Sequence, residues 1–521
     1  MAITTAKSTR NRLRAACSAA AILLLPAHAI AAEWTIVPSL DLKETYSDNI
    51  TLAPRGYEQS DFVTQVIPGI SLTGTGPRLR VNARYAMQNL FYAQESNRNT
   101  INHMLNANAN AELVDNLLFM DGLASISQQN ISLTGPQAAD NVNVTGNRTE
   151  VKTYSLSPYL RHSFGNTASS ELRYTHSAVS SGVGGLADSQ TDRINLGINS
   201  GSAFRTVGWG LNYSNQKTAY DNSASTLIQS RDNEVISGNL RYMVTSRFSL
   251  KATGGYEKND YISIGTKPEG SFWSGGFSWT PGPLTSIDAS AGKRFFGNTY
   301  SLAASHRTRL TAWNIAYNED ITSTQSQFLL PPTIDTSGFL NQLWAATIPD
   351  PVARQQIVDS FIQANGLPLS LAESLNYLTN RLFLQKSLRA SVALTGARNT
   401  LVLSLFNTSR NAQTAQAQDS ILFGSSNLAL SDKTRQVGGN ALWNWRLGPR
   451  TSANINAGYT RMSYPELDRT DNDKTLRFSL VRQIQPKLSG AVELRRLQRD
   501  SSQSIGTYRE NAVTASLHMS F

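Results

Sequence analysis

Cysteine is nearly absent from this sequence: the 521 residues contain one, Cys17. It lies in an N-terminal segment with the composition of a secretory signal peptide, so the exported chain is expected to contain no cysteine. Without thiols that chain can form neither a disulfide framework nor a thiolate metal site. The small secreted domains that depend on disulfides are thereby excluded.

Long hydrophobic runs are also missing. After residue 32 no run of ~18 apolar residues occurs, so the sequence predicts no transmembrane helix. Clusters of basic residues are missing as well, although the chain has a net charge of +10 and a pI of about 9.6. Because lysine and arginine are scattered along a chain expected to be exported, no nucleic-acid partner is predicted.

Residues 1–32 are predicted to be a signal peptide that is removed on export. A basic region precedes a short apolar core from Ala15 to Leu25, and small residues between Ala29 and Ala32 offer cleavage sites. A retained N-terminal anchor is the alternative. Removal leaves residues 33–521 with a net charge of +6. The basic residues removed are Lys7, Arg10, Arg12 and Arg14.

What the sequence does contain is alternation of apolar and polar residues in segments of about ten residues, which is typical of transmembrane β-strands. From residue 79 onward, Leu79, Val81 and Ala83 alternate with Arg80 and Arg84. The same pattern recurs near residues 154, 194, 236 and 388. A soluble β-sandwich shows similar alternation, because one face of an antiparallel sheet can be in water.

The lengths of the connections separate these alternatives. Tight turns, such as those at 76–77 and 165–166, alternate with longer polar loops, such as 47–60 and 132–148. Outer-membrane barrels have short periplasmic turns and long external loops. Residues 33–521 are therefore predicted to form an all-β fold: a large antiparallel transmembrane β-barrel of about 22 strands, within a range of 18 to about 26. The predicted location is the outer membrane of a Gram-negative cell.

Residues 323–385 break the alternation and are predicted to be a small helical insertion. Asp350 followed by Pro351 starts one helix that Gly366 ends, and Ser370 with Glu373 can cap a second helix. The strand count places this insertion at the external end of the barrel. It is either an ornamented external loop or a plug that covers the pore.

The last segment, residues 510–521, is predicted to be the closing strand. Its apolar row should face lipid, and the terminal phenylalanine resembles the signature that the barrel-assembly machinery reads. A closed barrel has no free edge, so this strand should pair with residues 34–46. The residues assigned to closure and assembly are Val513, Leu517, Met519 and Phe521.

The polar faces of the strands carry the candidate functional residues. Arginine in lipid costs about 2–4 kcal/mol at the membrane midplane, so these side chains should line the lumen. An arginine-lined lumen favours anionic solutes; alternatively, Arg–Glu and Arg–Asn networks only brace a wide barrel. Glu171, Glu234 and Glu493 are predicted to share the inward face. The predicted lumen residues are Arg80, Arg84, Arg161, Arg173, Arg193, Arg241, Arg389, Arg446, Arg477 and Arg495.

No catalytic constellation is evident. After residue 32 the histidines are His103, His162, His176, His306 and His518, and none lies in a compact motif with serine or aspartate. Acidic loop residues lack a fuller set of calcium ligands. We therefore predict no catalytic residue, no metal site and no cofactor.

Two stretches are similar to the PEP-CTERM system-associated outer-membrane proteins. The N-terminal stretch is Trp34–Leu40 with Glu44–Ile50 and Leu52–Pro54. The second comprises Ile348–Pro351, Arg354, Leu378–Phe383, Lys386–Ser391 and Gly396–Thr400. Such proteins are encoded with exopolysaccharide synthesis and sorting systems, so the resemblance implies a link to surface polysaccharide or biofilm matrix. It supplies no catalytic residues.

Together these patterns predict a porin-like outer-membrane barrel, not an enzyme, that serves export or surface assembly of an exopolysaccharide through a passive, arginine-rich lumen. A non-conducting scaffold that anchors or binds matrix is the alternative, and a barrel hydrolase is a third. The expected partners are outer-membrane lipid and lipopolysaccharide, the barrel-assembly machinery, an anionic polysaccharide and export components.

Overall fold

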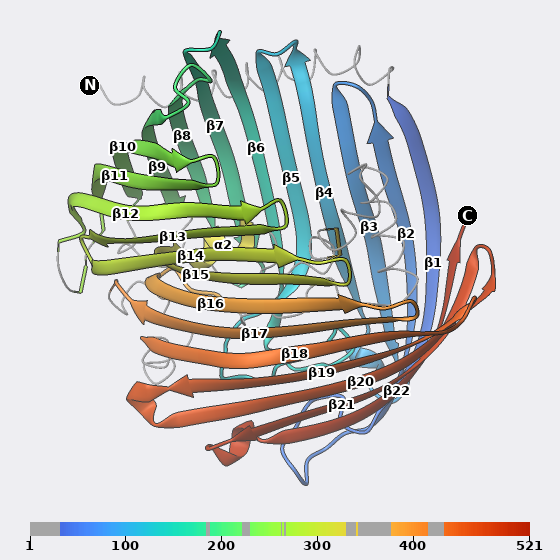
Figure 1. Ribbon diagram of the computed structural model, residues 1–521. Coiled ribbons are helices and arrows are strands. Elements are labelled where there is room, and N and C mark those ends of the chain that lie inside the picture. The colour runs from blue at the N-terminus through green and yellow to red at the C-terminus, as the bar shows by residue number, and fades with distance from the viewer. Residues whose placement is uncertain are drawn as a thin grey trace, which may run out of the picture.

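The computed structural model describes residues 32–183, 188–220, 230–261, 263–264, 267–329, 340–341, 377–414 and 432–521. These residues form one sheet of 22 antiparallel strands, each paired with its neighbour in sequence, and β22 pairs with β1 to close the barrel (Figure 1). Among the described residues, no helix is long and apolar enough to cross a membrane. The predicted fold class is confirmed.

The elements are as follows. The strands are β1 (Glu33–Ser47), β2 (Asp61–Thr75), β3 (Leu79–Tyr92), β4 (Thr100–Val114), β5 (Leu118–Asn130), β6 (Arg148–Phe164), β7 (Ala168–Ser181), β8 (Ser189–Ser200), β9 (Val207–Tyr220), β10 (Arg231–Thr245), β11 (Phe248–Asn259), β12 (Glu269–Gly282), β13 (Thr285–Arg294), β14 (Gly297–Arg307), β15 (Thr311–Ser323), β16 (Leu382–Thr395), β17 (Asn399–Ala412), β18 (Lys433–Gly448), β19 (Thr451–Tyr464), β20 (Arg469–Gln485), β21 (Leu488–Ser501) and β22 (Tyr508–Ser520). The helices are η1 (Ser96–Arg98), α2 (Thr324–Leu329), η4 (Pro465–Leu467) and η5 (Ser504–Gly506).

The two ends of the barrel differ in their connections. The even-numbered strands from β2 to β20 join the next strand through two or three residues, or through six between β8 and β9, and we call this the turn end. Asn116 and Gly165 have φ angles of 52° and 58° in two of these turns, a region that asparagine and glycine adopt more readily than other residues. The opposite, loop end carries most of the longer connections. The predicted alternation of connection lengths therefore holds for most of the barrel.

Two connections differ from the predicted alternation of lengths. Phe295 and Phe296 form a two-residue turn at the loop end, between β13 and β14. The loop-end connection between β19 and β20 is also short, residues 465–468, because residues from Arg469 onward continue the ladder of β20. The predicted helices from Asp350 and from Ser370 lie outside the described residues, except that Tyr377 and Leu378 are in irregular structure.

The seam between the first and last strands follows the predicted pairing. β1 pairs with β22 from Ser39 opposite Ser520 to Ser47 opposite Ala512. On the inward face the Thr45 and Thr514 hydroxyls lie 3.0 Å apart, and His518 Nδ1 lies 2.7 Å from an Asp41 carboxylate oxygen. Residues of the apolar row predicted for this strand are exposed on the outer face, as expected for lipid contact; they are Val513, Leu517, Met519 and Phe521.

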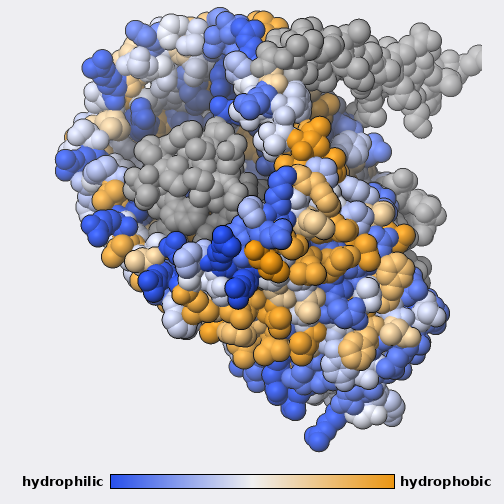
Figure 2. Space-filling model, turned by 90° about the vertical axis from the view of Figure 1, so that its right-hand side faces the viewer, coloured by the Kyte–Doolittle hydropathy of each residue, from blue (hydrophilic) through white to orange (hydrophobic). Residues whose placement is uncertain are grey.

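The outer wall is apolar in the manner of a membrane protein. Large side chains such as Leu240, Leu405 and Trp273 are at least 58% exposed. Figure 2 shows hydrophobic residues gathered in a band on the wall, with hydrophilic residues beyond it. Buried apolar clusters lie instead where loops pack against the inward faces of strands. The barrel is therefore apolar outside, and its buried packing is in the lumen.

Candidate functional site

The lumen is crossed by the connection between β5 and β6, residues 131–147, which we call the lumen loop. The loop does not extend from its own strands into solvent. Val142 packs with Ile50, Val63 and Leu90, and Ala138 and Ala139 pack near Leu497 and Tyr508. These partners come from the region where the barrel closes. The loop therefore reaches from β5 and β6 to β1–β3 and β20–β22.

Four arginines on the inward faces of β20 and β21, which we call the loop clamp, hold the lumen loop. Arg469 donates to the carbonyl of Thr134 at 3.1 Å, and Arg477 donates to the carbonyl of Ala139 at 3.1 Å. Irregular backbone leaves carbonyl groups without ladder partners, and guanidinium groups have several donors to satisfy them. Arg499 donates to the carbonyls of Gly135 and Leu133 at 2.9 and 3.0 Å. The fourth member, Arg495, pairs with the Asp140 carboxylate.

Acidic residues on the neighbouring strands fix the clamp. Arg495 lies 2.8 Å from Glu510 of β22, and both side chains are at most 1% exposed. Arg499 lies 2.7 Å from Asp471 of β20, which also pairs with Arg469 at 3.0 Å. Buried charges persist where they are paired and hydrogen-bonded. These ion pairs orient Arg469, Arg495 and Arg499 toward the lumen loop.

Asp140 is the charged residue of the lumen loop in this contact. Its partial burial favours the neutral acid, but Arg495, Arg477 and the backbone N–H of Val142 stabilise the carboxylate and hold the pKa of Asp140 below its usual value of 3.8. The carboxylate is consequently ionised at neutral pH. It links the loop to the clamp through charge as well as through backbone hydrogen bonds.

The described ends of the 323–385 insertion also lie in the lumen. Gln325 of α2 donates to the Thr191 hydroxyl at 2.8 Å, and Leu378 packs with Val151 and Val179. The N–H of Leu378 donates to the carbonyl of Ile131 at 3.2 Å, which joins the insertion to the lumen loop. The described residues of the insertion therefore lie inside the barrel at the loop end.

All ten predicted arginines lie on the inward faces of their strands. Most of them alternate with apolar residues that point outward, such as Leu240 and Tyr242 beside Arg241 and Leu476 and Phe478 beside Arg477. Four of the ten have carboxylate partners: Arg161 and Arg173 share Glu171, Arg477 lies near Glu493, and Arg495 belongs to the clamp. The bracing interpretation fits these four.

The other six arginines have no carboxylate within ion-pair distance among the described residues. Arg193 donates to the Gln216 side chain, and Arg446 donates to the carbonyl of Ala397 at 2.8 Å. The charge of these side chains is therefore not neutralised by an ion pair within the described residues. The six are Arg80, Arg84, Arg193, Arg241, Arg389 and Arg446.

One predicted lumen residue is misplaced. Glu234 was expected to face inward, but it shares the outward phase of Ile236 and Leu240 on β10. It accepts a hydrogen bond from the Tyr213 hydroxyl at 3.1 Å near the loop end of the wall. An acid is tolerated there because it lies beyond the apolar band. Glu171 and Glu493 face inward as predicted.

The ten turns of the turn end are strongly basic. They contain one acidic residue, Asp115, which pairs with Arg78 at 3.1 Å. In Figure 2 strongly hydrophilic residues border the opening of the barrel. The basic residues of the turns are Arg78, Arg205, Arg247, Arg309, Arg398, Arg450 and Lys487, all of them exposed.

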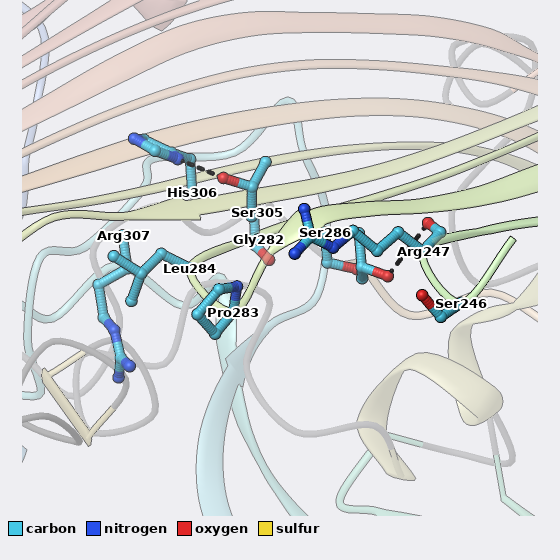
Figure 3. A pocket seen from close by; sticks show the side chains of 11 residues that line it. Ser246, Arg247, Gly282, Pro283, Leu284, Ser286, Ser305, His306 and Arg307 are labelled. Carbon is cyan, nitrogen blue, oxygen red and sulfur yellow. Dashed lines mark hydrogen bonds between the residues drawn. The ribbon is translucent and has the colours of Figure 1, made fainter.

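A recess of about 530 Å³ lies among the turns and strand ends of β10–β14. Figure 3 shows Arg247 and Arg307 at its edges, with Pro283 and Leu284 between them. His306 lies 2.8 Å from the hydroxyl of Thr285, and Arg247 donates to the carbonyl of Pro281 at 3.1 Å. The recess thus belongs to the basic surface of the turn end.

Histidine geometry bears on the hydrolase hypothesis. His176 lies 2.8 Å from Asp192, and His518 lies 2.7 Å from Asp41. The second nitrogen of His176 faces the phenol of Tyr154 at 3.4 Å. Among the described residues, no serine or threonine hydroxyl contacts either ring, and no group of three acidic, histidine or cysteine side chains could hold a metal ion.

Neither the lumen loop nor its clamp was predicted from the sequence. The loop was expected to be an external polar loop. Leu133 and Val142 were the available signal, because apolar residues inside a polar loop indicate a buried contact. Arg469 and Arg499 were missed because nothing in their strand pattern separates a clamp from a solvent-lining face.

The fold and the lumen define this chain as a large outer-membrane β-barrel. No protein-family model and no curated protein matches it. Among solved structures, the apoprotein of the FrpB iron transporter from Neisseria meningitidis is similar, with a TM-score of 0.50 and 9% identity over 93% of this chain and 81% of that chain. The siderophore receptor PirA from Acinetobacter baumannii gives a TM-score of 0.47 at 10% identity over 93% of this chain and 80% of that chain. At such identity the similarity concerns the barrel fold alone.

Proposed function

We propose that this barrel is a passive conduit for an anionic exopolysaccharide, used in its export or surface assembly. The observation that carries the proposal is the set of six inward arginines without carboxylate partners, which continues into the basic turns. Rings of arginine favour anions, and a charged passage concentrates solutes of the opposite charge. The sequence resemblance to PEP-CTERM system-associated outer-membrane proteins supports a polysaccharide as the anion.

The arrangement suggests a direction of passage. A polyanion approaching the turn end meets exposed basic turns first and then Arg80, Arg241 and Arg446 on the inward wall. The lumen loop lies farther on, held by the clamp. We infer that passage requires this loop to leave the clamp, so that Arg495 and Arg499 become available to the polymer in place of Asp140 and the loop carbonyls.

The second candidate is a non-conducting scaffold, and the clamped lumen loop favours it. In that case the barrel anchors matrix polymer or sorting components at the cell surface and nothing passes through. Its longer loops then supply the binding surface. Nothing in the proposal assigns an enzymatic activity to the chain.

A cell-based experiment separates the two functions. In a strain lacking this protein, the conduit function predicts that polymer accumulates inside the envelope and that little appears outside. Complementation with a variant carrying Arg80→Gln, Arg84→Gln, Arg241→Gln and Arg446→Gln should restore a folded barrel but only part of the export. Normal secretion of polymer that no longer adheres to cells would overturn the conduit and support the scaffold.

A further inference from the structure

A row of basic residues crosses the outer face of the barrel, away from the lumen. Each of its members lies on the outward phase of its strand, between β18 and β22, near the loop end. We call this row the outer basic patch. Its members are Arg435, Arg461, Lys474, Arg496 and Arg509.

The strand register makes the patch continuous. Arg461 faces Val437, two residues from Arg435, and it also faces Asn472, two residues from Lys474. By the same rule, Lys474 faces Gln498, two residues from Arg496. Arg496 then faces Asn511, two residues from Arg509. Each basic residue is thus a diagonal neighbour of the next, at about 7–8 Å.

The diagonal places the row at one height in the membrane. Strands of a closed barrel are tilted, so residues at equal height shift along successive strands. From β18 to β21 the row moves two residues toward the turn end at each strand, and at β22 it returns by two. If one follows directly opposite residues from β1 through every strand and back to β1, the position shifts toward the loop end. Residues at equal height must therefore shift toward the turn end from one strand to the next, which is the direction in which the row moves from β18 to β21.

The apolar band begins directly beneath the patch. Leu476 lies two residues after Lys474 on β20, and Leu494 lies two residues before Arg496 on β21; both are about half exposed. Positive charge is costly at mid-membrane but costs only about 0–1 kcal/mol near the interface. The patch therefore lies at headgroup level, with acyl chains expected against the leucines.

The patch is poor in acidic partners. Lys474 pairs with Asp500 at 2.9 Å. Arg435 and Arg496 reach only the amide oxygens of Asn407 and Asn511, at 3.4 and 3.5 Å. Among the described residues, none of the four arginines has a carboxylate within ion-pair distance. Elsewhere on the outer wall, Lys152 and Lys217 are paired with Glu150 and Asp232.

We propose that the outer basic patch binds the phosphate groups of a phosphorylated glycolipid in the membrane leaflet at the loop end. Guanidinium groups bind phosphate through paired hydrogen bonds, and spaced arginines can hold two phosphates of one headgroup. The adjoining apolar wall receives the acyl chains of the same molecule. The site is independent of the lumen and of any conduit function.

The test uses the full-length barrel purified in detergent and native mass spectrometry with added diphosphoryl lipid A. Wild type should retain the glycolipid, and the triple variant R461Q/R496Q/R509Q should bind it about a hundredfold more weakly, since each lost charge weakens attraction to an anionic lipid. The variant K152Q/K217Q, which removes outward lysines that already have acidic partners, should bind as wild type. Heat-dependent gel mobility verifies that each variant is a folded barrel.

Further binding measurements test whether the patch recognises the phosphate groups of a glycolipid and not free phosphate or another anion. Dephosphorylated lipid A should bind weakly to wild type, and inorganic phosphate should not displace the diphosphoryl form. Equal binding by the triple variant and wild type, or equal loss in the lysine control, would overturn the proposal. So would an acidic oligosaccharide that binds the patch while diphosphoryl lipid A does not.

Discussion

Arg495 joins the wall of this barrel to its lumen loop. It contacts Glu510 of the closing strand on one side and Asp140 of the loop on the other. Glu510 also accepts hydrogen bonds from Ser47 of β1 and Asn143 of the loop, each at 2.7 Å. One buried pair therefore connects three elements that are far apart in sequence: both strands of the seam and the lumen loop.

Replacing Arg495 by glutamine should release the loop. The change leaves Glu510 buried without its cation, and breaking a buried ion pair costs about 3–5 kcal/mol. Protease cleavage within residues 131–147 should become much faster than in wild type. Arg241→Gln is the matched control, because Arg241 also faces the lumen but is exposed and has no carboxylate partner among the described residues. Similar cleavage of wild type and R495Q would contradict the role of the clamp.

Acid should release the same loop in the unmodified protein. Because the pKa of Asp140 is lower in the folded protein than its usual 3.8, its contribution to loop attachment is fully present above pH 3.8 and is lost as pH falls through the lower folded value. A spin label at Ala138→Cys should become mobile only in that acidic range. An Asp140→Asn variant should show high mobility already at neutral pH, and an unchanged spectrum in that variant would contradict the assignment.

At the scale of elements, the strands were predictable because the membrane imposes a period of two. Lipid on one side and lumen on the other select apolar and polar residues alternately, so both the strand number and the pairing of β1 with β22 follow from local pattern. Glu234 departs from the prediction because its direction follows its phase relative to Ile236 and not its acidic character.

The lumen loop could not be predicted, because its partners are set by tertiary structure. Arg499 donates to Leu133 across 366 positions of sequence. No local period marks an arginine that clamps a loop, since Arg84 and Arg495 both simply occupy the inward phase of a strand. The strand pattern predicts that the six arginines without carboxylate partners face the lumen. It does not predict that they lack such partners, because this depends on which residues lie opposite them on the neighbouring strands.

The closing strand gives a prediction at this scale. Leu517→Arg places a charge on the lipid-facing side of β22, which costs about 2–4 kcal/mol near the membrane midplane. Ser516→Arg, one position earlier, places the same charge on the inward face and should cost little. Urea unfolding in lipid vesicles should show a clear loss of stability for L517R only. Equal destabilisation of both variants would contradict the assigned phase of the strand.

For the whole molecule, the distribution of charge along the lumen is the feature that bears on function. The turns of the turn end are basic, and the inward wall near them carries Arg80, Arg241 and Arg446 beside the acid-paired Arg161 and Arg173. Near the loop end the clamp arginines pair with acidic residues and with the lumen loop. An anion would therefore meet basic turns at one end and the clamped lumen loop toward the other. The proposed conduit uses this asymmetry, whereas a barrel that is only braced does not require it.

The most direct test of this account is the reversal potential of the R495Q barrel in a planar bilayer, measured across a potassium chloride gradient. The account predicts a steady conductance larger than that of wild type. The reversal potential should have the sign expected for a barrel that passes chloride in preference to potassium. Adding Arg80→Gln, Arg84→Gln, Arg241→Gln and Arg446→Gln should move that potential toward zero. Cation selectivity, or no conductance after the loop has been released, would contradict it.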